Sequence, residues 1–297
     1  MKRRDFMIRT GIAAATVSLA GGAWADGSPS RHFIHEHDGA AGPVLNLKGL
    51  KIGAGAPKII ASITGRDPEE VMRQARAIGT SGQVDMAELR LDYLPETIGH
   101  RALDALVNQV VLTLNGKPLL ATFRSKKEGG ERALSDIDYF SLYSTLLESA
   151  PIDLLDIEMM KPEAQVRDSI AKAHAMGVAV VLSNHDFEST PAHTTIIERL
   201  QRQQALGGDI LKMAAMPKSP ADVLALMLAT QEMHASHAQR PLLTMSMGPM
   251  GITSRIAGQL TGSSLTYASM GSASAPGQMD AGAVRTVLEI MEKGSEA

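Results

Sequence analysis

From residue 58 onward, short runs of β-branched and apolar residues alternate with longer stretches of helical period. This alternation is typical of βα units that build a parallel sheet. Eight runs are predicted to form strands, at residues 58–64, 84–91, 118–124, 152–158, 177–183, 209–215, 241–247 and 264–270. The amphipathic segments predicted as helices include 68–80, 135–149, 163–176, 194–206, 221–235 and 281–292.

Eight such units in about 240 residues match a single (β/α)8 TIM barrel, whose usual size is about 250 residues. A doubly wound sheet commonly has fewer strands. We therefore predict one α/β domain, a catalytic barrel over residues 44–297. Residues 44–55 carry alternating apolar side chains before the first strand. We predict a short N-terminal hairpin there, closing the floor of the barrel.

Composition excludes several classes of protein. The chain has 297 residues, 29 Lys and Arg against 32 Asp and Glu, and only 3% aromatic residues. It therefore lacks the basic surface expected for duplex nucleic acid and the aromatic platform expected for single strands. The absence of cysteine excludes disulfides, thiolate metal sites and a cysteine nucleophile.

The first 25 residues have the pattern of a bacterial export signal. Residues 2–7 read Lys-Arg-Arg-Asp-Phe-Met, a weakly apolar run follows at 11–22, and Ala-Trp-Ala ends at Ala25. The first motif resembles the twin-arginine consensus, and the last is an A-x-A cleavage site. The apolar run is too short to span a bilayer. We expect export of the folded protein to the periplasm with cleavage after Ala25; the alternative is a retained tether.

Residues 26–43 are predicted to form a flexible linker, because they are rich in Gly, Ser and Pro and show no apolar period. Three histidines near two acidic residues lie in this stretch, and such a set can in principle bind a metal. Without a rigid scaffold, a solvated tail is the expected state. Removal of the signal leaves 25 basic and 31 acidic residues, a net charge of −6.

Polar residues gather where predicted strands end. Glu88, Arg90 and Asp92 share one face of a strand because side chains alternate with period two. Other strand ends carry further charged or titratable residues, namely Arg124, Glu158 and His185. In a barrel these positions meet at the C-terminal rim, where active sites of this fold lie. The sequence therefore predicts an active site at that rim.

Lys212 stands inside the apolar run 210–216. Burial disfavours an ammonium, and a neutral amine there can attack a carbonyl to form a Schiff base. The alternative is a lysine that reaches the rim or pairs with a carboxylate. His185 lies one barrel position away and is a suitable proton shuttle. Glu128, in a loop that contains Gly129, can orient it as the acidic member of a triad does.

Two segments after the seventh and eighth strands carry candidate binding groups. Arg255 is predicted to lie early in a helix, where it suits an anionic ligand such as a carboxylate. The alternative is a surface ion pair. Ser274 and Gln278 offer hydroxyl and amide groups to a polyhydroxylated substrate.

Taken together, these segments resemble type I 3-dehydroquinate dehydratase from about residue 47 to the C-terminus. The matching segments, in chain order, are 55–60, 88–92, 122–131, 183–187, 209–212, 244–247, 254–255 and 273–278. The resemblance implies a cofactor-free (β/α)8 barrel that dehydrates 3-dehydroquinate to 3-dehydroshikimate by syn elimination through a lysine imine. It also suggests a homodimer.

The resemblance assigns a role to each candidate residue. Lys212 would form the imine with the C3 ketone, His185 would move protons at C2 and at the C1 hydroxyl, and Glu128 would orient His185. Arg255 would bind the substrate carboxylate. The remaining candidates would hold hydroxyl and ketone oxygens, namely Glu88, Arg90, Arg124, Ser274 and Gln278. No metal is implied.

The export signal departs from family members that serve aromatic amino-acid synthesis, which are cytoplasmic. It implies the twin-arginine translocase as a partner and a periplasmic role in quinate catabolism. Two alternative functions remain open. One is another Schiff-base barrel of the class I aldolase type, and the other is a catalytically inactive periplasmic binding relative.

Overall fold

The computed structural model describes residues 33–38, 42–271 and 274–295. The export signal predicted at residues 1–25 and most of the predicted linker lie outside these residues and stay predictions. Within the described part of the chain, no helix has both the length and the apolar character needed to span a bilayer.

Eight parallel strands form the central sheet of the described residues, in the order β10-β9-β8-β7-β6-β5-β4-β11. The amide of Ser264 donates to the carbonyl of Leu242 at 2.7 Å, which brings the two edge strands together and nearly closes the barrel. The eight predicted strands and the TIM-barrel fold are confirmed. The strands are β4 (Lys58–Ile63), β5 (Met86–Arg90), β6 (Leu119–Thr122), β7 (Leu154–Glu158), β8 (Ala179–Asp186), β9 (Ile210–Ala215), β10 (Leu242–Ser246) and β11 (Leu265–Tyr267).

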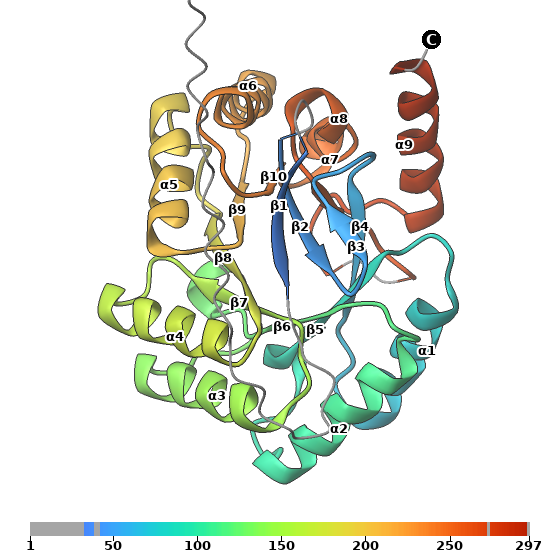
Figure 1. Ribbon diagram of the computed structural model, residues 1–297, viewed down its shortest axis with the longest axis vertical. Coiled ribbons are helices and arrows are strands. Elements are labelled where there is room, and N and C mark those ends of the chain that lie inside the picture. The colour runs from blue at the N-terminus through green and yellow to red at the C-terminus, as the bar shows by residue number, and fades with distance from the viewer. Residues whose placement is uncertain (1–32, 39–41, 272–273, 296–297) are drawn as a thin grey trace, which may run out of the picture. The chain divides into compact units, whose positions relative to one another are not determined.

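Helices follow the strands and lie around the barrel (Figure 1). Several begin at a sequence-encoded cap: Asp67 accepts the amide of Glu70, and Ser219 forms a capping box with Asp222. The long helices are α1 (Pro68–Thr80), α2 (His100–Thr113), α3 (Asp136–Ser149), α4 (Glu163–Ala175), α5 (His193–Leu206), α6 (Pro220–Ser236) and α9 (Ala281–Ser295). The short helices α7 (Ile252–Ile256) and α8 (Gly258–Thr261) separate β10 from β11.

The N-terminal hairpin closes the barrel floor, as predicted. It consists of β2 (Gly42–Leu47) and β3 (Leu50–Ile52), joined by a turn in which Lys48 and Gly49 both have positive φ. Leu45, Leu47 and Ile52 pack in one cluster with residues near the start of the barrel strands, such as Ile60 of β4. The apolar alternation in the hairpin thus supplies the lower layer of the barrel core.

Part of the predicted linker forms a strand. β1 (Ile34–Asp38) pairs antiparallel with β2, so the prediction of a flexible linker over residues 26–43 is wrong for this stretch. His35 Nε2 lies 2.7 Å from Asp209, a carboxylate that His174 Nε2 also contacts at 2.8 Å. Backbone pairing and this polar contact hold the strand, so its sequence does not need an apolar period. Sequence reasoning therefore had no such pattern to detect.

Candidate active site

All nine predicted site residues line one cavity at the C-terminal ends of the strands. Phe187, Met245, Met247 and Tyr267 supply much of its apolar and aromatic wall. The predicted residues brought together there are Glu88, Arg90, Arg124, Glu128, His185, Lys212, Arg255, Ser274 and Gln278. They come from strand ends and rim loops far apart in the sequence, as the barrel topology requires.

Lys212 projects inward from β9 and is almost fully buried, with 3% of its surface exposed. Its Nζ donates to Asp156 Oδ2 at 3.0 Å and to the Tyr267 hydroxyl at 3.2 Å. Burial by itself would raise the pKa of Asp156, but Arg124 and Lys212 outweigh it and lower that pKa to about 2. A permanent carboxylate therefore compensates the buried lysine.

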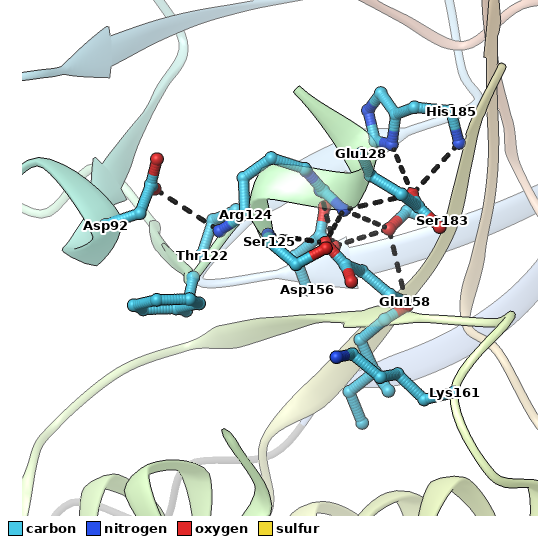
Figure 2. A network of polar contacts seen from close by, with 12 residues as sticks. Asp92, Thr122, Arg124, Ser125, Glu128, Asp156, Glu158, Lys161, Ser183 and His185 are labelled. Atoms are coloured by element: carbon cyan, nitrogen blue, oxygen red, sulfur yellow. Dashed lines mark hydrogen bonds and ion pairs between the residues drawn. The ribbon is translucent and has the colours of Figure 1, made fainter. Parts of the chain in front are cut away.

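Arg124 lies at the centre of the polar network in Figure 2. Its guanidinium contacts Asp156 Oδ1 at 2.7 Å and Glu158 Oε1 at 3.1 Å, and it donates to the Ser183 hydroxyl at 3.1 Å. Burial opposes its charge, yet the surrounding carboxylates hold the pKa of Arg124 well above its ordinary value. Arg124 thus binds mainly protein groups and fixes the carboxylates around the lysine.

His185 and Glu128 form a close pair at the edge of this network (Figure 2). Glu128 Oε2 lies 2.9 Å from His185 Nδ1 and accepts the His185 backbone amide at 3.0 Å. Burial, followed by the charges of Arg124, Lys212 and Arg90, lowers the pKa of His185 well below its ordinary value. The ring is therefore neutral near pH 7, and with Nδ1 directed to Glu128, Nε2 remains available as a base.

The loop that carries Glu128 is shaped by two glycines. The short 3-10 helix Lys126–Glu128 ends at Gly129, which has a φ of +84°. A Cβ at Gly129 would lie 2.2 Å from the ring of Phe187, and one at Gly130 would lie 1.9 Å from the carbonyl of Arg124. Only glycine permits this approach, so the loop that carries Glu128 packs directly against Phe187, just after the end of the strand that carries His185.

Arg255, in α7, is a buried cation without a carboxylate partner among the described residues. Its Nη2 donates to the carbonyl of Pro276 at 3.1 Å, and its buried Nε has no hydrogen-bond partner there. Burial lowers the pKa of Arg255 to about 10. The guanidinium is still charged near pH 7, and its unpaired donors suit an anion entering the cavity.

Arg90 is paired more completely. Its Nε and Nη2 donate to the two carboxylate oxygens of Asp92 at 2.8 and 2.7 Å, and its guanidinium lies over the ring of Tyr93. Such a bidentate pair holds the side chain in one orientation. Arg90 therefore presents one fixed edge of its guanidinium to the cavity, and the carboxylate of Asp92 offsets most of its charge.

Glu88 is the end of a chain of hydrogen bonds that starts on the loop after β11. Gln278 Nε2 donates to the Ser274 hydroxyl at 2.9 Å, and that hydroxyl donates to the Ser62 hydroxyl at 2.9 Å. Ser62 donates in turn to Glu88 Oε2 at 2.6 Å. Ser274, Gln278 and Glu88 are thus positioned together, as a row of polar groups along one wall.

Two residues at the lysine were not singled out from the sequence, namely Asp156 and Tyr267. The signal available in the sequence was the alternation of strand side chains between the two faces of the sheet, which indicates the residues that point inward. Asp156 shares the inward face of β7 with Glu158, and Tyr267 ends the last strand. Nothing in the local sequence, however, indicates that both reach Lys212 from strands 55 and 56 residues distant.

Comparison with known proteins agrees with this geometry. The sequence model of the type I 3-dehydroquinase family matches residues 59–295. The chain belongs to the type I 3-dehydroquinase family. It is 42% identical to 3-dehydroquinate dehydratase of Escherichia coli O157:H7 over 249 residues, which cover 84% of this chain and 98% of the relative.

Solved structures of 3-dehydroquinate dehydratases are similar over most of this chain. The Clostridium difficile type I enzyme, crystallised with covalently modified comenic acid, has a TM-score of 0.82 at 35% identity and covers 84% of this chain and 98% of its own. The Enterococcus faecalis enzyme has a TM-score of 0.77 at 39% identity, with coverage of 82% and 97%. The chain is therefore an enzyme of this family.

Proposed function

We propose that this enzyme dehydrates 3-dehydroquinate to 3-dehydroshikimate through an imine of Lys212. One observation carries the proposal: a buried lysine and a neutral histidine, each held by its own acidic side chain, face one cavity that also contains Arg255, an arginine with no carboxylate partner among the described residues. Family membership and the names of the relatives supply the substrate. Covalent modification in the C. difficile structure is consistent with a nucleophile in the family site.

Imine formation uses Lys212 and His185. The Nζ lone pair attacks the C3 carbonyl carbon, and the oxygen leaves as water after proton transfer. Asp156, whose pKa is about 2, cannot retain a proton near neutral pH. His185, with its lowered pKa and free Nε2, is the group able to accept a proton and return it. Asp156 instead stabilises the positive charge of the protonated imine.

Elimination follows from the electronics of the imine. His185 removes a proton from C2, and the electron pair moves into the iminium to give an enamine. The enamine then expels the C1 hydroxyl, which leaves as water with the proton from His185. Hydrolysis of the conjugated imine releases 3-dehydroshikimate and restores Lys212, so the net change is the loss of one water. Glu128 stabilises the imidazolium that forms in between.

Substrate orientation is assigned to the remaining cavity residues. The unpaired donors of Arg255 bind the substrate carboxylate. The hydroxyl and ketone oxygens of the substrate are bound by side chains that line the cavity, namely Glu88, Arg90, Arg124, Ser274 and Gln278. The protein already holds these side chains in fixed geometry. The overall charge of −6 expected after signal removal repels an anion, so attraction of the substrate depends on the local cations.

Borohydride reduction during turnover tests the imine. We expect a substrate-derived mass on Lys212, and we expect Lys212→Ala to lose both this adduct and the ultraviolet absorbance of the enone product. Lys218→Ala, at an exposed lysine, is the matched control and should retain both. In His185→Ala the adduct should still form, more slowly, while turnover falls on the order of 10³-fold. Substrate-dependent reduction at another lysine would refute the assignment.

We also propose that the enzyme acts in the periplasm, in quinate catabolism. The support is the sequence of residues 1–25, which resembles a twin-arginine signal. Fractionation followed by mass spectrometry of the N-terminus tests this: a periplasmic chain that begins at Asp26 is expected. A cytosolic chain with the first 25 residues intact would contradict it.

The two alternative functions and the homodimer are separable by experiment. Enone formation from 3-dehydroquinate distinguishes a dehydratase from an aldolase-type barrel or an inactive binding relative, and the family match favours the dehydratase. The homodimer stays a prediction, for which light scattering of the purified enzyme should give twice the mass of one chain.

A further inference from the structure

The hydroxyl of Tyr267 is the second partner of the Lys212 amine. It lies 3.2 Å from Nζ and donates to Glu88 Oε1 at 2.9 Å. The side chain is 5% exposed, and burial, followed by the charge of Glu88, raises the pKa of Tyr267 well above its ordinary value. The phenol therefore keeps its proton.

Donor and acceptor roles follow from this arrangement. Glu88 also accepts from the Ser62 and Thr122 hydroxyls, so it is the acceptor in all three of these contacts. The single Tyr267 proton points to Glu88, and a Tyr267 lone pair must accept from Lys212. Asp156 accepts a second Nζ proton at 3.0 Å.

These two contacts define the direction of the remaining position on nitrogen. A lysine amine is tetrahedral: one bond goes to Cε, and Asp156 and Tyr267 take two N–H bonds. The fourth position carries the third proton of the ammonium or the lone pair of the amine. Because Lys212 lines the cavity, that position is the one open to an incoming carbonyl.

We propose that Tyr267 is a positioning residue that aims the Lys212 lone pair at the substrate ketone. The role rests on the proposed imine chemistry. It also couples the lysine to the binding wall, because Glu88 joins Tyr267 to the Ser62–Ser274–Gln278 chain. With one N–H contact only, the amine can rotate about its Cε–Nζ bond, and fewer encounters have the geometry for attack.

Tyr267→Phe removes the hydroxyl and keeps the ring that lies 4.9 Å from Nζ. Rapid mixing with 3-dehydroquinate and a timed quench into borohydride measures the rate of imine formation at saturating substrate. The final stoichiometry of adduct counts competent chains and so corrects for misfolded protein. We expect imine formation per competent chain to slow by about ten- to a hundredfold, the range for a hydrogen bond to a charged group.

Two measurements distinguish positioning from general structural damage. Quinate carries a hydroxyl in place of the C3 ketone, so its dissociation constant reports binding alone and should change less than about twofold. Tyr143→Phe is the matched control, because it loses a buried hydroxyl bonded to the carbonyl of Asp156 and to the amide of Phe123. It should form the imine at the wild-type rate per competent chain.

The outcomes separate this proposal from the one on which it rests. If the wild type forms no adduct at Lys212, the imine mechanism fails and this role fails with it. If the wild type forms the adduct and Tyr267→Phe forms it equally fast per competent chain, only the role of Tyr267 is refuted. Equal slowing in Tyr143→Phe, or a weakened affinity for quinate that accounts for the loss, would also refute it.

Discussion

Replacement of Arg255 by Met is expected to make the unliganded enzyme more stable and its substrate binding much weaker. Arg255 is buried, and no described carboxylate pairs with it. Burial lowers the pKa of Arg255 from its ordinary value to about 10. At 1.36 kcal/mol for each tenfold change in proton affinity, the folded protein holds this charge at a cost of about 3 kcal/mol.

The expected gain is smaller than that cost. Arg255→Met also removes the hydrogen bond to the Pro276 carbonyl, which contributes about 1 kcal/mol. A net increase of about 2 kcal/mol in the free energy of unfolding remains, corresponding to about 4–8 °C in Tm. Since a base with a lowered pKa destabilises the fold at every pH below that pKa, the gain should be the same from pH 6 to pH 9.

Thermal unfolding of both proteins, with and without quinate, measures these terms. Quinate should raise the Tm of the wild type and leave the Tm of Arg255→Met almost unchanged, because the charge-assisted contact to its carboxylate is lost. For the same reason the KM for 3-dehydroquinate is expected to rise by about ten- to a hundredfold or more. Arg167→Met is the control: Arg167 forms an exposed pair with Glu163, and its loss should alter stability by less than about 0.5 kcal/mol.

A less stable Arg255→Met that still responds to quinate would refute the reasoning. It would mean that the guanidinium is compensated within the protein and that the substrate carboxylate binds elsewhere. The predicted combination, higher stability with poorer binding, is expected for a buried charge that destabilises the free protein and stabilises the bound ligand.

Three further changes have defined outcomes. Burial raises the pKa of Glu128 to about 7, so its charge destabilises the fold as pH rises through that value; Glu128→Gln should raise Tm at pH 8 but not near pH 4, and lower kcat on the order of 10²-fold. Gly129→Ala should reduce kcat/KM by about tenfold, because its Cβ displaces Phe187; unchanged kinetics would contradict that contact. His35→Ala loses the bond to Asp209 and should lower Tm by about 2–4 °C while kcat stays constant; an unchanged Tm would show that β1 contributes nothing.

The sequence by itself determined the barrel fold and which end of the barrel carries the polar site residues. Strand and helix periods are local properties, so the eight strands, most helices and the floor hairpin were predictable. In a parallel barrel every strand ends at the same rim, and the polar residues at those ends had to share one cavity. The local pattern therefore placed Arg90, Arg124 and His185 together without any knowledge of distances.

Only the tertiary structure decided which charges pair and which stay free. Arg124 and Arg255 are both buried rim arginines, yet three carboxylates surround the first and none of the described ones contacts the second. The partners of Lys212 come from β7 and β11, and β1 is fixed by Asp209, which precedes β9. Pairing of buried charges depends on separations of a few ångströms between distant strands, because Coulomb and hydrogen-bond energies change steeply over that range, and sequence spacing carries no such information.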